Sequence, residues 1–230
     1  MADIQNLAKY LDHSVLKPES TAEDEIKKNA AEAVEFSYRA LVIHPCNISL
    51  AKKLLEGSKV LTVSVCDFPH GKGLIKSRAK DVKEILKLGA DEIDIVANYQ
   101  YLFEQNTRDF KKDLKAIAKS MEGKILKIIL EVDLLNERQI KNAVQTICKV
   151  ANEENSKIII KTKTGFTENK MQNIDAVKVI KKYLGELNQY GEDKIRIKAS
   201  GGIRTKQDVI NLIEAGAHII GTSKSKEIIT

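Results

Sequence analysis

Short apolar runs and longer amphipathic stretches alternate along the whole chain. Each apolar run is rich in β-branched residues, and each except the last precedes a stretch with helical features. The predicted strands cover residues 40–44, 60–66, 92–97, 125–132, 157–162, 195–199 and 218–222. The chain therefore repeats one unit, a strand followed by a helix.

Two of the helical stretches have clear end signals. Thr205 can cap a helix in which Asp208 completes a capping box, and Gly216 would end the same helix. Gly89 similarly ends the stretch over residues 75–88.

Strands joined through helices run parallel, which leaves a doubly wound open sheet or a closed (β/α)8 barrel. A barrel needs an eighth strand, and residues 10–13 can supply it after a short N-terminal helix. No linker or low-complexity segment divides the chain, so we expect residues 1–230 to form a single α/β domain, a (β/α)8 TIM barrel.

Alternation within the strands favours the barrel. Its outer strand face lies under helices and must be apolar, whereas its inner face can carry polar groups. Three strands place their charges on one face: Lys194, Arg196 and Lys198; Glu92 and Asp94; Lys127 and Glu131. Buried charges are costly unless paired, so the set predicts either a structural ion-pair network or a catalytic site. A structural role explains the inward position of any single one of these residues at least as well as a catalytic role does. A catalytic site better explains why the whole set converges.

Composition excludes several classes of protein. The 230 residues are 43% apolar and 30% charged, the balance of a folded globular protein. The formal charge of +6 comes from lysines scattered along the chain, with few arginines, 5% aromatic residues and no tryptophan, so we expect no nucleic-acid partner. The charge reflects general lysine richness or mild steering of an anionic substrate, and we favour the first explanation.

The sequence shows no membrane span, no signal peptide and no metal-ligand spacing, and these absences bear on the expected location and metal content. No apolar run approaches the roughly 20 residues of a membrane span, and the first residues show no signal-peptide pattern. We therefore expect a cytoplasmic protein without a membrane partner. Three distant cysteines and four histidines show no ligand spacing, so no disulfide and no metal is expected.

Residues 161–166, Lys-Thr-Lys-Thr-Gly-Phe, place a lysine at a strand end in the predicted barrel interior. A lysine attacks carbonyl groups when burial or a neighbouring cation lowers its pKa, and Lys198 on the adjacent strand could supply that cation. The resulting Schiff base would let a C–C bond break or form through an enamine, with Asp94 as general acid and base. The spacing alone would favour two ordinary strand-end lysines.

Two glycine-containing segments follow the last two predicted strands. Residues 200–205 join a strand to a helix, and residues 221–223 follow the final strand. Glycines let backbone N–H groups approach an anion, and these loops are the usual phosphate position in a barrel. The pair of segments predicts a phosphate site, although either alone would be an ordinary turn.

Six motifs make the chain resemble the class I 2-deoxyribose-5-phosphate aldolase family over nearly its whole length. They are residues 11–18 (LDHSVLKP), 67–71 (DFPHG), 89–96 (GADEIDIV), 126–131 (LKIILE), 161–166 (KTKTGF) and 198–205 (KASGGIRT). The resemblance implies reversible cleavage of 2-deoxy-D-ribose 5-phosphate to D-glyceraldehyde 3-phosphate and acetaldehyde, in deoxynucleoside catabolism. It also implies a barrel without metal or cofactor, a phosphosugar partner and a homodimer, although no apolar stripe identifies an interface.

The matched motifs also imply site residues. Lys161 would be the Schiff-base lysine, Lys198 the lysine that lowers its pKa, and Asp94 the proton relay. Four residues would line the substrate site: Asp12, Lys127, Thr162 and Thr164. Four would bind phosphate: Gly165, Gly201, Gly202 and Ser223.

The chain departs from the family pattern at three places. Lys163 stands where the family usually has serine, and it could point toward Lys161, toward phosphate or toward solvent. Lys224 and Ser225 replace the family's Ser-Gly, and Lys224 could compensate as a phosphate partner. Val42 stands where many members have cysteine, which implies greater tolerance of reactive aldehydes.

Two other functions remain open at the level of sequence. A phosphosugar isomerase or epimerase on the same barrel would use the carboxylates for proton transfer and would not need the two lysines. A phosphate-metabolite binder would have lost activity through Lys163, Lys224 and Ser225. The site residues must decide, because barrels host many reactions.

Overall fold

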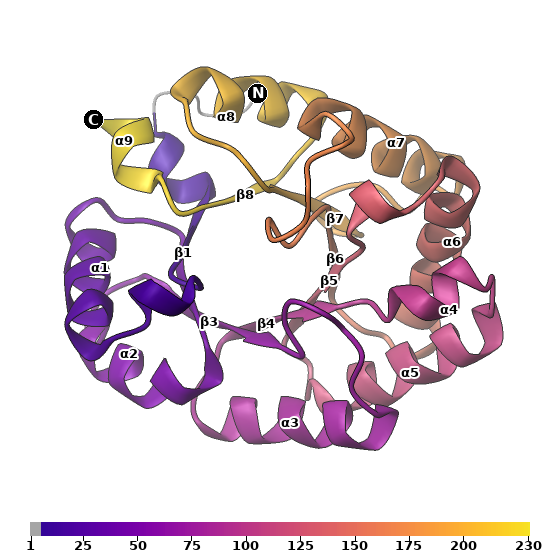
Figure 1. The fold of residues 1–230 in the computed structure, drawn as a ribbon, viewed down its shortest axis with the longest axis horizontal. Helices are drawn as coiled ribbons and strands as arrows, with labels where there is room; N and C mark the ends of the chain where they lie inside the picture. The colour runs from indigo at the N-terminus through magenta and orange to yellow at the C-terminus, as the bar shows by residue number, and fades with distance from the viewer. Residues whose placement is uncertain (1–5) are drawn as a thin grey trace.

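Each strand pairs in parallel with the next, and the last pairs with the first, so the sheet closes into a barrel (Figure 1). The computed structural model describes residues 6–230, and the first five residues of the predicted domain lie outside that range. Within it the strands are β1 (Leu11–Ser14), β2 (Ala40–Ile43), β3 (Leu61–Cys66), β4 (Glu92–Val96), β5 (Ile125–Ile129), β6 (Ile158–Lys161), β7 (Arg196–Ser200) and β8 (Ile219–Thr222).

The predicted strands are confirmed, with ends that differ by at most three residues. The segment predicted over residues 10–13 is β1, and it follows the short helix Leu7–Tyr10. The largest difference is in β5, predicted to reach residue 132 but ending at Ile129. Glu131 has φ of 53°, the left-handed region that a strand cannot include, so it does not share the inner face with Lys127.

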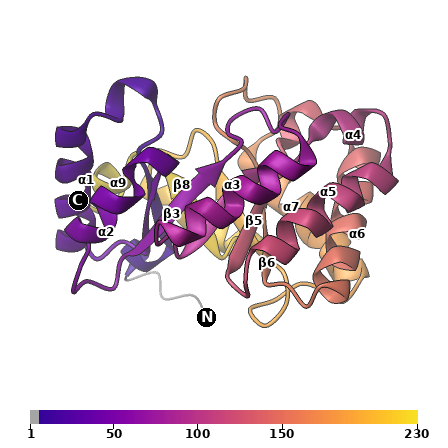
Figure 2. The ribbon, with the colours of Figure 1, turned by 90° about the horizontal axis from the view of Figure 1, so that it is seen from below.

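Helices surround the barrel (Figures 1 and 2). They are α1 (Glu23–Glu35), α2 (Ile48–Leu54), α3 (Ile75–Lys87), α4 (Tyr99–Phe103), α5 (Thr107–Ser120), α6 (Glu137–Glu153), α7 (Asn173–Glu186), α8 (Lys206–Ala215) and α9 (Ser225–Ile229). The predicted capping box of α8 is present, since Thr205 Oγ1 accepts from Asp208 N at 3.1 Å and Asp208 Oδ2 from Thr205 N at 2.9 Å. Gly216 ends α8 with φ of 118°. No helix in residues 6–230 has both the length and the apolar character needed to cross a bilayer.

The apolar residues form two separate layers. The larger one lies between the outer strand faces and the helices, and includes Ile93, Ile128 and Ile160. The smaller one lies inside the barrel and consists mainly of Leu16, Ala40, Val42, Val63 and Val65. The inside of the barrel is therefore apolar on the side of β2 and β3, which leaves the opposite side for charged residues.

The loops that follow the strands gather at one end of the barrel. In Figure 2 the loops after β1, β3 and β6 rise together at the upper end. All strands run parallel, so their carboxyl ends meet at this same end. Residues at the strand ends are thereby brought to one mouth.

Candidate active site

Strand register places the two predicted lysines side by side. Lys161 is the last residue of β6, and Lys198 is its partner on β7. Asp94 on β4 is likewise paired with Lys127 on β5. Paired residues on neighbouring strands point to the same face. All four side chains point into the barrel and are almost completely buried.

Asp94 contacts all three lysines. Its Oδ2 accepts from Lys161 Nζ at 3.0 Å and from Lys198 Nζ at 2.8 Å, while its Oδ1 accepts from Lys127 Nζ at 2.8 Å. Lys198 Nζ also donates to Asp12 Oδ2 at 2.6 Å. The candidate Schiff-base lysine therefore belongs to a continuous ion-pair network.

Further charges extend the network away from the mouth. Arg39 donates to Asp12 Oδ1 at 2.6 Å and to Glu92 Oε1 at 2.5 Å. Lys127 Nζ lies 2.6 Å from Glu92 Oε2. The sequence pattern did not single out Arg39, because one basic residue before an apolar strand is common. Its position directly before β2, next to the barrel interior, was the available signal.

The network contains one more basic group than acidic groups. Its members are Lys127, Lys161, Lys198 and Arg39 on one side and Asp12, Glu92 and Asp94 on the other. A buried network is least costly when its charges cancel, and arginine stays protonated. The four-to-three count therefore balances when one lysine is neutral.

Of the three lysines in the network, Lys161 has the fewest carboxylates to stabilise its charged form. It contacts one carboxylate, Asp94, whereas Lys198 contacts two and Lys127 lies within 4 Å of three. Burial is the main cause that lowers the pKa of Lys161 to about 8, with Lys198 and Lys127 adding to the shift and Asp94 opposing it. A neutral amine at this position can act as a nucleophile.

Asp94 is shifted in the direction that keeps it ionised. Burial alone would raise its pKa, but the ammonium groups of Lys127, Lys198 and Lys161 outweigh that effect and hold the pKa of Asp94 well below its usual range. Burial alone would also raise the pKa of Asp12, but the neighbouring basic groups outweigh that effect and lower it. Both carboxylates therefore remain charged partners for the lysines.

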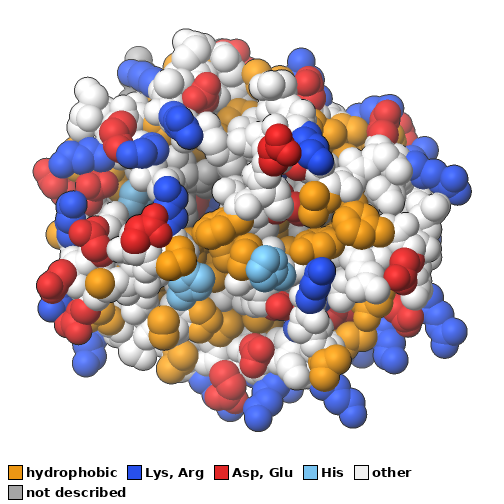
Figure 3. Space-filling model, viewed as in Figure 1, with side chains coloured by type: hydrophobic (Ala, Val, Ile, Leu, Met, Phe, Trp, Pro, Cys, Tyr) orange, Lys and Arg blue, Asp and Glu red, His pale blue; other side chains and the backbone are white. Residues whose placement is uncertain are grey.

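An aromatic wall stands beside Lys161. The Phe68 ring centroid lies 5.9 Å from Lys161 Nζ, and Phe166 packs edge-on against Phe68 with 5.1 Å between ring centroids. In Figure 3, which views the molecule as Figure 1 does, hydrophobic side chains gather across the middle and charged ones around the edge. The aromatic rings exclude water from one side of the amine and add to its desolvation.

A cavity of about 370 Å³ is lined by both lysines and by the loops after β6, β7 and β8. The backbone of Gly165, Gly201 and Gly202 lines it at φ of 84°, 97° and 69°. Glycine adopts these left-handed conformations without strain, and such turns present N–H groups to anions. The cavity thus joins an amine nucleophile to a surface suited to phosphate.

The predicted site residues fall into two layers. Seven line the cavity: Lys161, Lys198, Thr164, Gly165, Gly201, Gly202 and Ser223. Three are fully buried in the charged network: Asp12, Asp94 and Lys127. Thr162 is also fully buried but belongs to neither layer, and its role in the substrate site stays a prediction. Its hydroxyl donates to Ser200 O at 3.3 Å and accepts from Ser200 N at 3.0 Å, so it joins β6 to β7.

Thr164 and Glu131 hold the loop after β6 in place. The Thr164 hydroxyl donates to Glu131 Oε2, and the Thr164 backbone N–H donates to the same oxygen at 3.2 Å. The Thr164 hydroxyl also accepts from Phe166 N at 3.1 Å. Thr164 lines the cavity, but its hydroxyl is engaged within the protein.

Lys163 does not add a cation beside Lys161. Its Nζ donates to Asp133 Oδ1 at 2.9 Å and to Met171 O at 2.6 Å, and its side chain is buried. Of the three orientations left open by the sequence, none is the observed one. Lys163 is instead bound within the protein by an acidic residue of the β5–α6 connection.

The other departures also have defined positions. Ser225 is buried, and its hydroxyl bonds to His13 Nδ1 at 2.9 Å, so it does not line the cavity. Lys224 does line the cavity, and its Nζ pairs with Glu227 at 2.7 Å. Val42 lines the cavity, whereas none of the three cysteines does.

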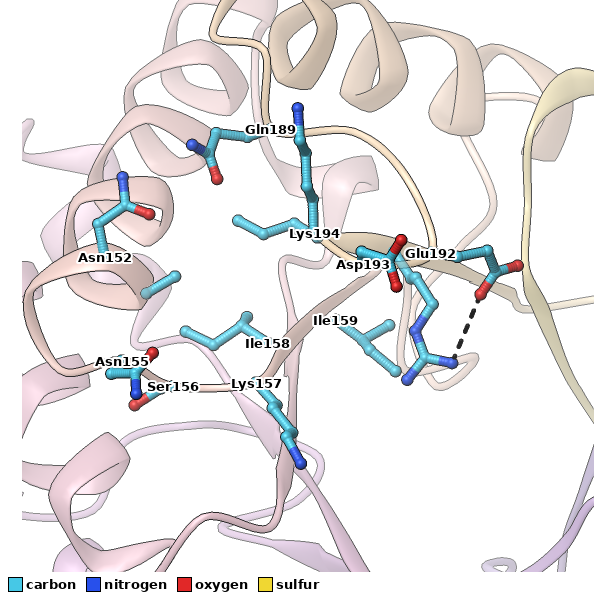
Figure 4. A pocket seen from close by; sticks show the side chains of 13 residues that line it. Asn152, Asn155, Ser156, Lys157, Ile158, Ile159, Gln189, Glu192, Asp193 and Lys194 are labelled. Carbon is cyan, nitrogen blue, oxygen red and sulfur yellow. Dashed lines mark ion pairs between the residues drawn. The ribbon is translucent and has the colours of Figure 1, made fainter.

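A second cavity, of about 700 Å³, lies at the opposite end of β6 and β7 (Figure 4). Amides and surface charges line it, including Asn152, Gln189 and Lys194, and Glu192 lies 3.9 Å from Arg196. Barrel active sites occur at the carboxyl ends of strands, so the mouth cavity is the candidate. In the part of the chain that the structure describes, no group of three or more His, Cys, Asp or Glu is arranged to hold a metal ion.

The chain is similar to known proteins over nearly its whole length. Residues 6–223 match the DeoC/LacD family aldolase model. Deoxyribose-phosphate aldolase of Finegoldia magna is 35% identical to this chain, and the alignment covers 97% of this chain and 98% of that protein. Deoxyribose-phosphate aldolase of Clostridium novyi is 36% identical, and the alignment covers 97% of this chain and 95% of that protein. The tetrameric deoxyribose phosphate aldolase from Aeropyrum pernix has a TM-score of 0.84 at 25% identity, covering 100% of this chain and 92% of that chain. The chain therefore belongs to the DeoC/LacD family, and it is an aldolase, a lyase built on a (β/α)8 barrel.

Proposed function

We propose that the chain reversibly cleaves 2-deoxy-D-ribose 5-phosphate to acetaldehyde and D-glyceraldehyde 3-phosphate through a Schiff base on Lys161. The observation that carries the proposal is the buried network of four basic groups and three carboxylates, in which Lys161 loses its proton unusually easily, next to a cavity lined on one side by glycines. The relatives that span nearly the whole chain are named for this substrate. An isomerase or epimerase would have no use for the neutral amine.

The reaction begins with the neutral Lys161 amine. Its lone pair attacks C1 of the open-chain aldehyde, water leaves, and a protonated imine forms. The C3 hydroxyl gives its proton to the Asp94–Lys198 pair, the C2–C3 bond breaks, and its electron pair moves toward the imine to give an enamine. C3 becomes the aldehyde of glyceraldehyde 3-phosphate. Protonation of the enamine at C2 and hydrolysis then release acetaldehyde and restore Lys161.

Asp94 and Lys198 move the protons in this scheme. Both groups are within hydrogen-bond distance of each other, and Asp94 also contacts Lys161. The Lys198 ammonium gives a proton to the departing water and later to C2 of the enamine, and the ionised Asp94 accepts the C3 hydroxyl proton and returns it to Lys198. Asp12 and Lys127 position this pair from below through their own contacts.

The phosphate end of the substrate would lie against Gly165, Gly201, Gly202 and Ser223. Arg204, Lys17 and Lys224 line the same cavity and would attract its charge. The proposal includes a homodimer as the assembly and the cytoplasm as the location. The unpaired state of all three cysteines supports a reducing compartment.

Borohydride trapping tests the substrate and the mechanism together. Reduction in the presence of 2-deoxyribose 5-phosphate should convert the imine to a stable secondary amine on Lys161, identified by peptide mass spectrometry. Lys161→Ala and Lys161→Met should show no adduct and no acetaldehyde release. An adduct on another lysine, or none on folded wild-type protein, contradicts the proposal and favours an isomerase or a binding protein.

The pH dependence of trapping tests the cause of Lys161 reactivity. Because the pKa of Lys161 is lowered to about 8, wild-type trapping should rise with pH with a midpoint near 8. Lys198→Met should raise that midpoint, since a neighbouring cation is lost and Asp94 keeps fewer partners, and turnover should fall by about 10²–10⁴-fold. Lys198→Arg should keep the low midpoint, and Lys194→Met, in the connection before β7, is the control. If the midpoint in Lys198→Met is unchanged or lower, the Lys198 cation is not a cause of the lowered pKa of Lys161.

Lys163→Ser restores the residue usual in the family and separates Lys163 from Lys161. The acidic limb of the kcat/KM profile should stay where it is in wild type, because Lys163 is bound to Asp133 rather than facing the amine. Asp133 keeps its backbone N–H bonds from Lys170 and Met171 in this variant. A limb that moves to higher pH would mean that Lys163 acts on Lys161 directly.

Val42→Cys tests tolerance of aldehydes. A thiol at Val42 would line the cavity, where it can add to unsaturated aldehydes formed by condensation of acetaldehyde. Wild type should keep its activity during incubation with concentrated acetaldehyde, Val42→Ala should behave similarly, and Val42→Cys should lose activity with time. Equal inactivation of wild type and Val42→Cys would contradict the prediction.

A further inference from the structure

Lys163 uses all of its hydrogen-bonding capacity inside the protein. Its Nζ donates to Asp133 at 2.9 Å, to Asn169 Oδ1 at 3.3 Å and to Met171 O at 2.6 Å. An ammonium group has three N–H donors and no acceptor. No donor therefore remains for a substrate phosphate, and Lys163 must act on the site through the residues it holds.

Asp133 completes a clamp on the loop after β6. Its Oδ1 accepts the backbone N–H of Lys170 at 3.0 Å and of Met171 at 2.7 Å, in addition to the Lys163 ammonium. A buried ion pair is tolerated when further hydrogen bonds stabilise its charges, and here three donors converge on Asp133 Oδ1. The pair fixes the backbone directly after Asn169.

The contact with Lys163 also fixes which way the Asn169 amide faces. Because an ammonium can only donate, the amide oxygen must face Lys163 and the NH2 group must face away. Asn169 Nδ2 lies 3.0 Å from the point that a Cβ on Gly202 would occupy, and Asn169 lines the cavity. The NH2 group is thus directed to the open space left by the glycine.

The same network shapes the glycine pair. The Lys163 side chain packs beneath Gly201, with Cδ 3.1 Å from the point that a Cβ there would occupy. Asn173 Nδ2 donates to Gly201 O at 2.5 Å. In a trans peptide the N–H of Gly202 points opposite to that carbonyl. Lys163 and Asn173 therefore support the turn from one side, while Asn169 reaches it from another.

We propose that Asn169 is a phosphate-binding residue of this chain, whose NH2 group donates to a phosphate oxygen beside Gly202, with Lys163 as its positioning residue. The proposal rests on the phosphosugar substrate of the proposed function and adds a ligand that the sequence motifs did not contain. It also explains Lys163 as part of the phosphate site, through Asn169, rather than as a modifier of Lys161.

Calorimetric binding of sn-glycerol 3-phosphate tests the assignment without aldolase chemistry, because this monoester has no carbonyl group. Asn169→Ala should raise Kd about tenfold, the effect of losing one hydrogen bond to a charged group. Asn169→Asp should raise it further, because a carboxylate would face the phosphate. The exposed Asn152→Ala, at the opposite end of the barrel, should bind as wild type does.

A kinetic comparison separates binding from folding effects. The ratio of kcat/KM for 2-deoxyribose 5-phosphate to that for 2-deoxyribose should fall about tenfold in Asn169→Ala. A merely structural role would lower both values together and leave the ratio. Lys163→Ser should lower the ratio too, and add little in the Asn169→Ala background.

The outcomes for the two proposals can be told apart. Unchanged monoester affinity in both Asn169 variants, or no monoester binding by wild type, overturns the role of Asn169 even if Lys161 is trapped by the phosphosugar. Weakened monoester binding without trapping on Lys161 upholds Asn169 as a phosphate ligand and contradicts the aldolase substrate instead.

Discussion

The inside of this barrel holds four basic side chains against three carboxylates, and much of the site depends on that unequal count. Water is excluded from most of the network, so an extra positive charge there is expensive. The proton that is easiest to remove belongs to Lys161, which contacts a single carboxylate and stands beside an aromatic wall. The arrangement of its neighbours thus makes Lys161 easier to deprotonate than an ordinary lysine.

The same barrel separates the reacting end of the cavity from its anion-binding end. Residues of β4 to β7, joined by Asp12 of β1 and Arg39 before β2, form the charged network, while β2 and β3 fill the interior with apolar side chains such as Val63 and Val65. The loops after β6 and β7 bring the glycine turns over the lysines. Lys163 shows how a departure from the family pattern is accommodated: Asp133, in the neighbouring connection, binds it and so separates it from Lys161.

The sequence predicted the architecture well because its signals were local and repeated. Alternation of isoleucine with Glu92 and Asp94 gave the inner face of β4, and Thr205 with Asp208 gave the start of α8. The end of β5 was wrong because the left-handed conformation of Glu131 carries no reliable sequence signal for a non-glycine residue. Strand ends are set by such individual backbone conformations, and hydrophobic pattern alone does not determine them.

Side-chain partners across distant segments could not be predicted in the same way. Arg39 meets Asp12 and Glu92 only because the barrel closes. Thr162 is turned toward β7, and the direction of Lys163 depends on Asp133, thirty positions earlier in the chain. These contacts follow from tertiary geometry, which a motif identifies only when it already includes both partners.

The most direct test of this account is an NMR titration of Lys161 itself. Selective labelling of lysine side chains, with Lys161→Met to assign the resonance, would give its pKa in the free enzyme. The account predicts a midpoint near 8, well below the lysine value of 10.5, because of burial and the excess of neighbouring cations. A midpoint at or above 10.5 would show that Lys161 stays protonated in the network and would contradict the central claim.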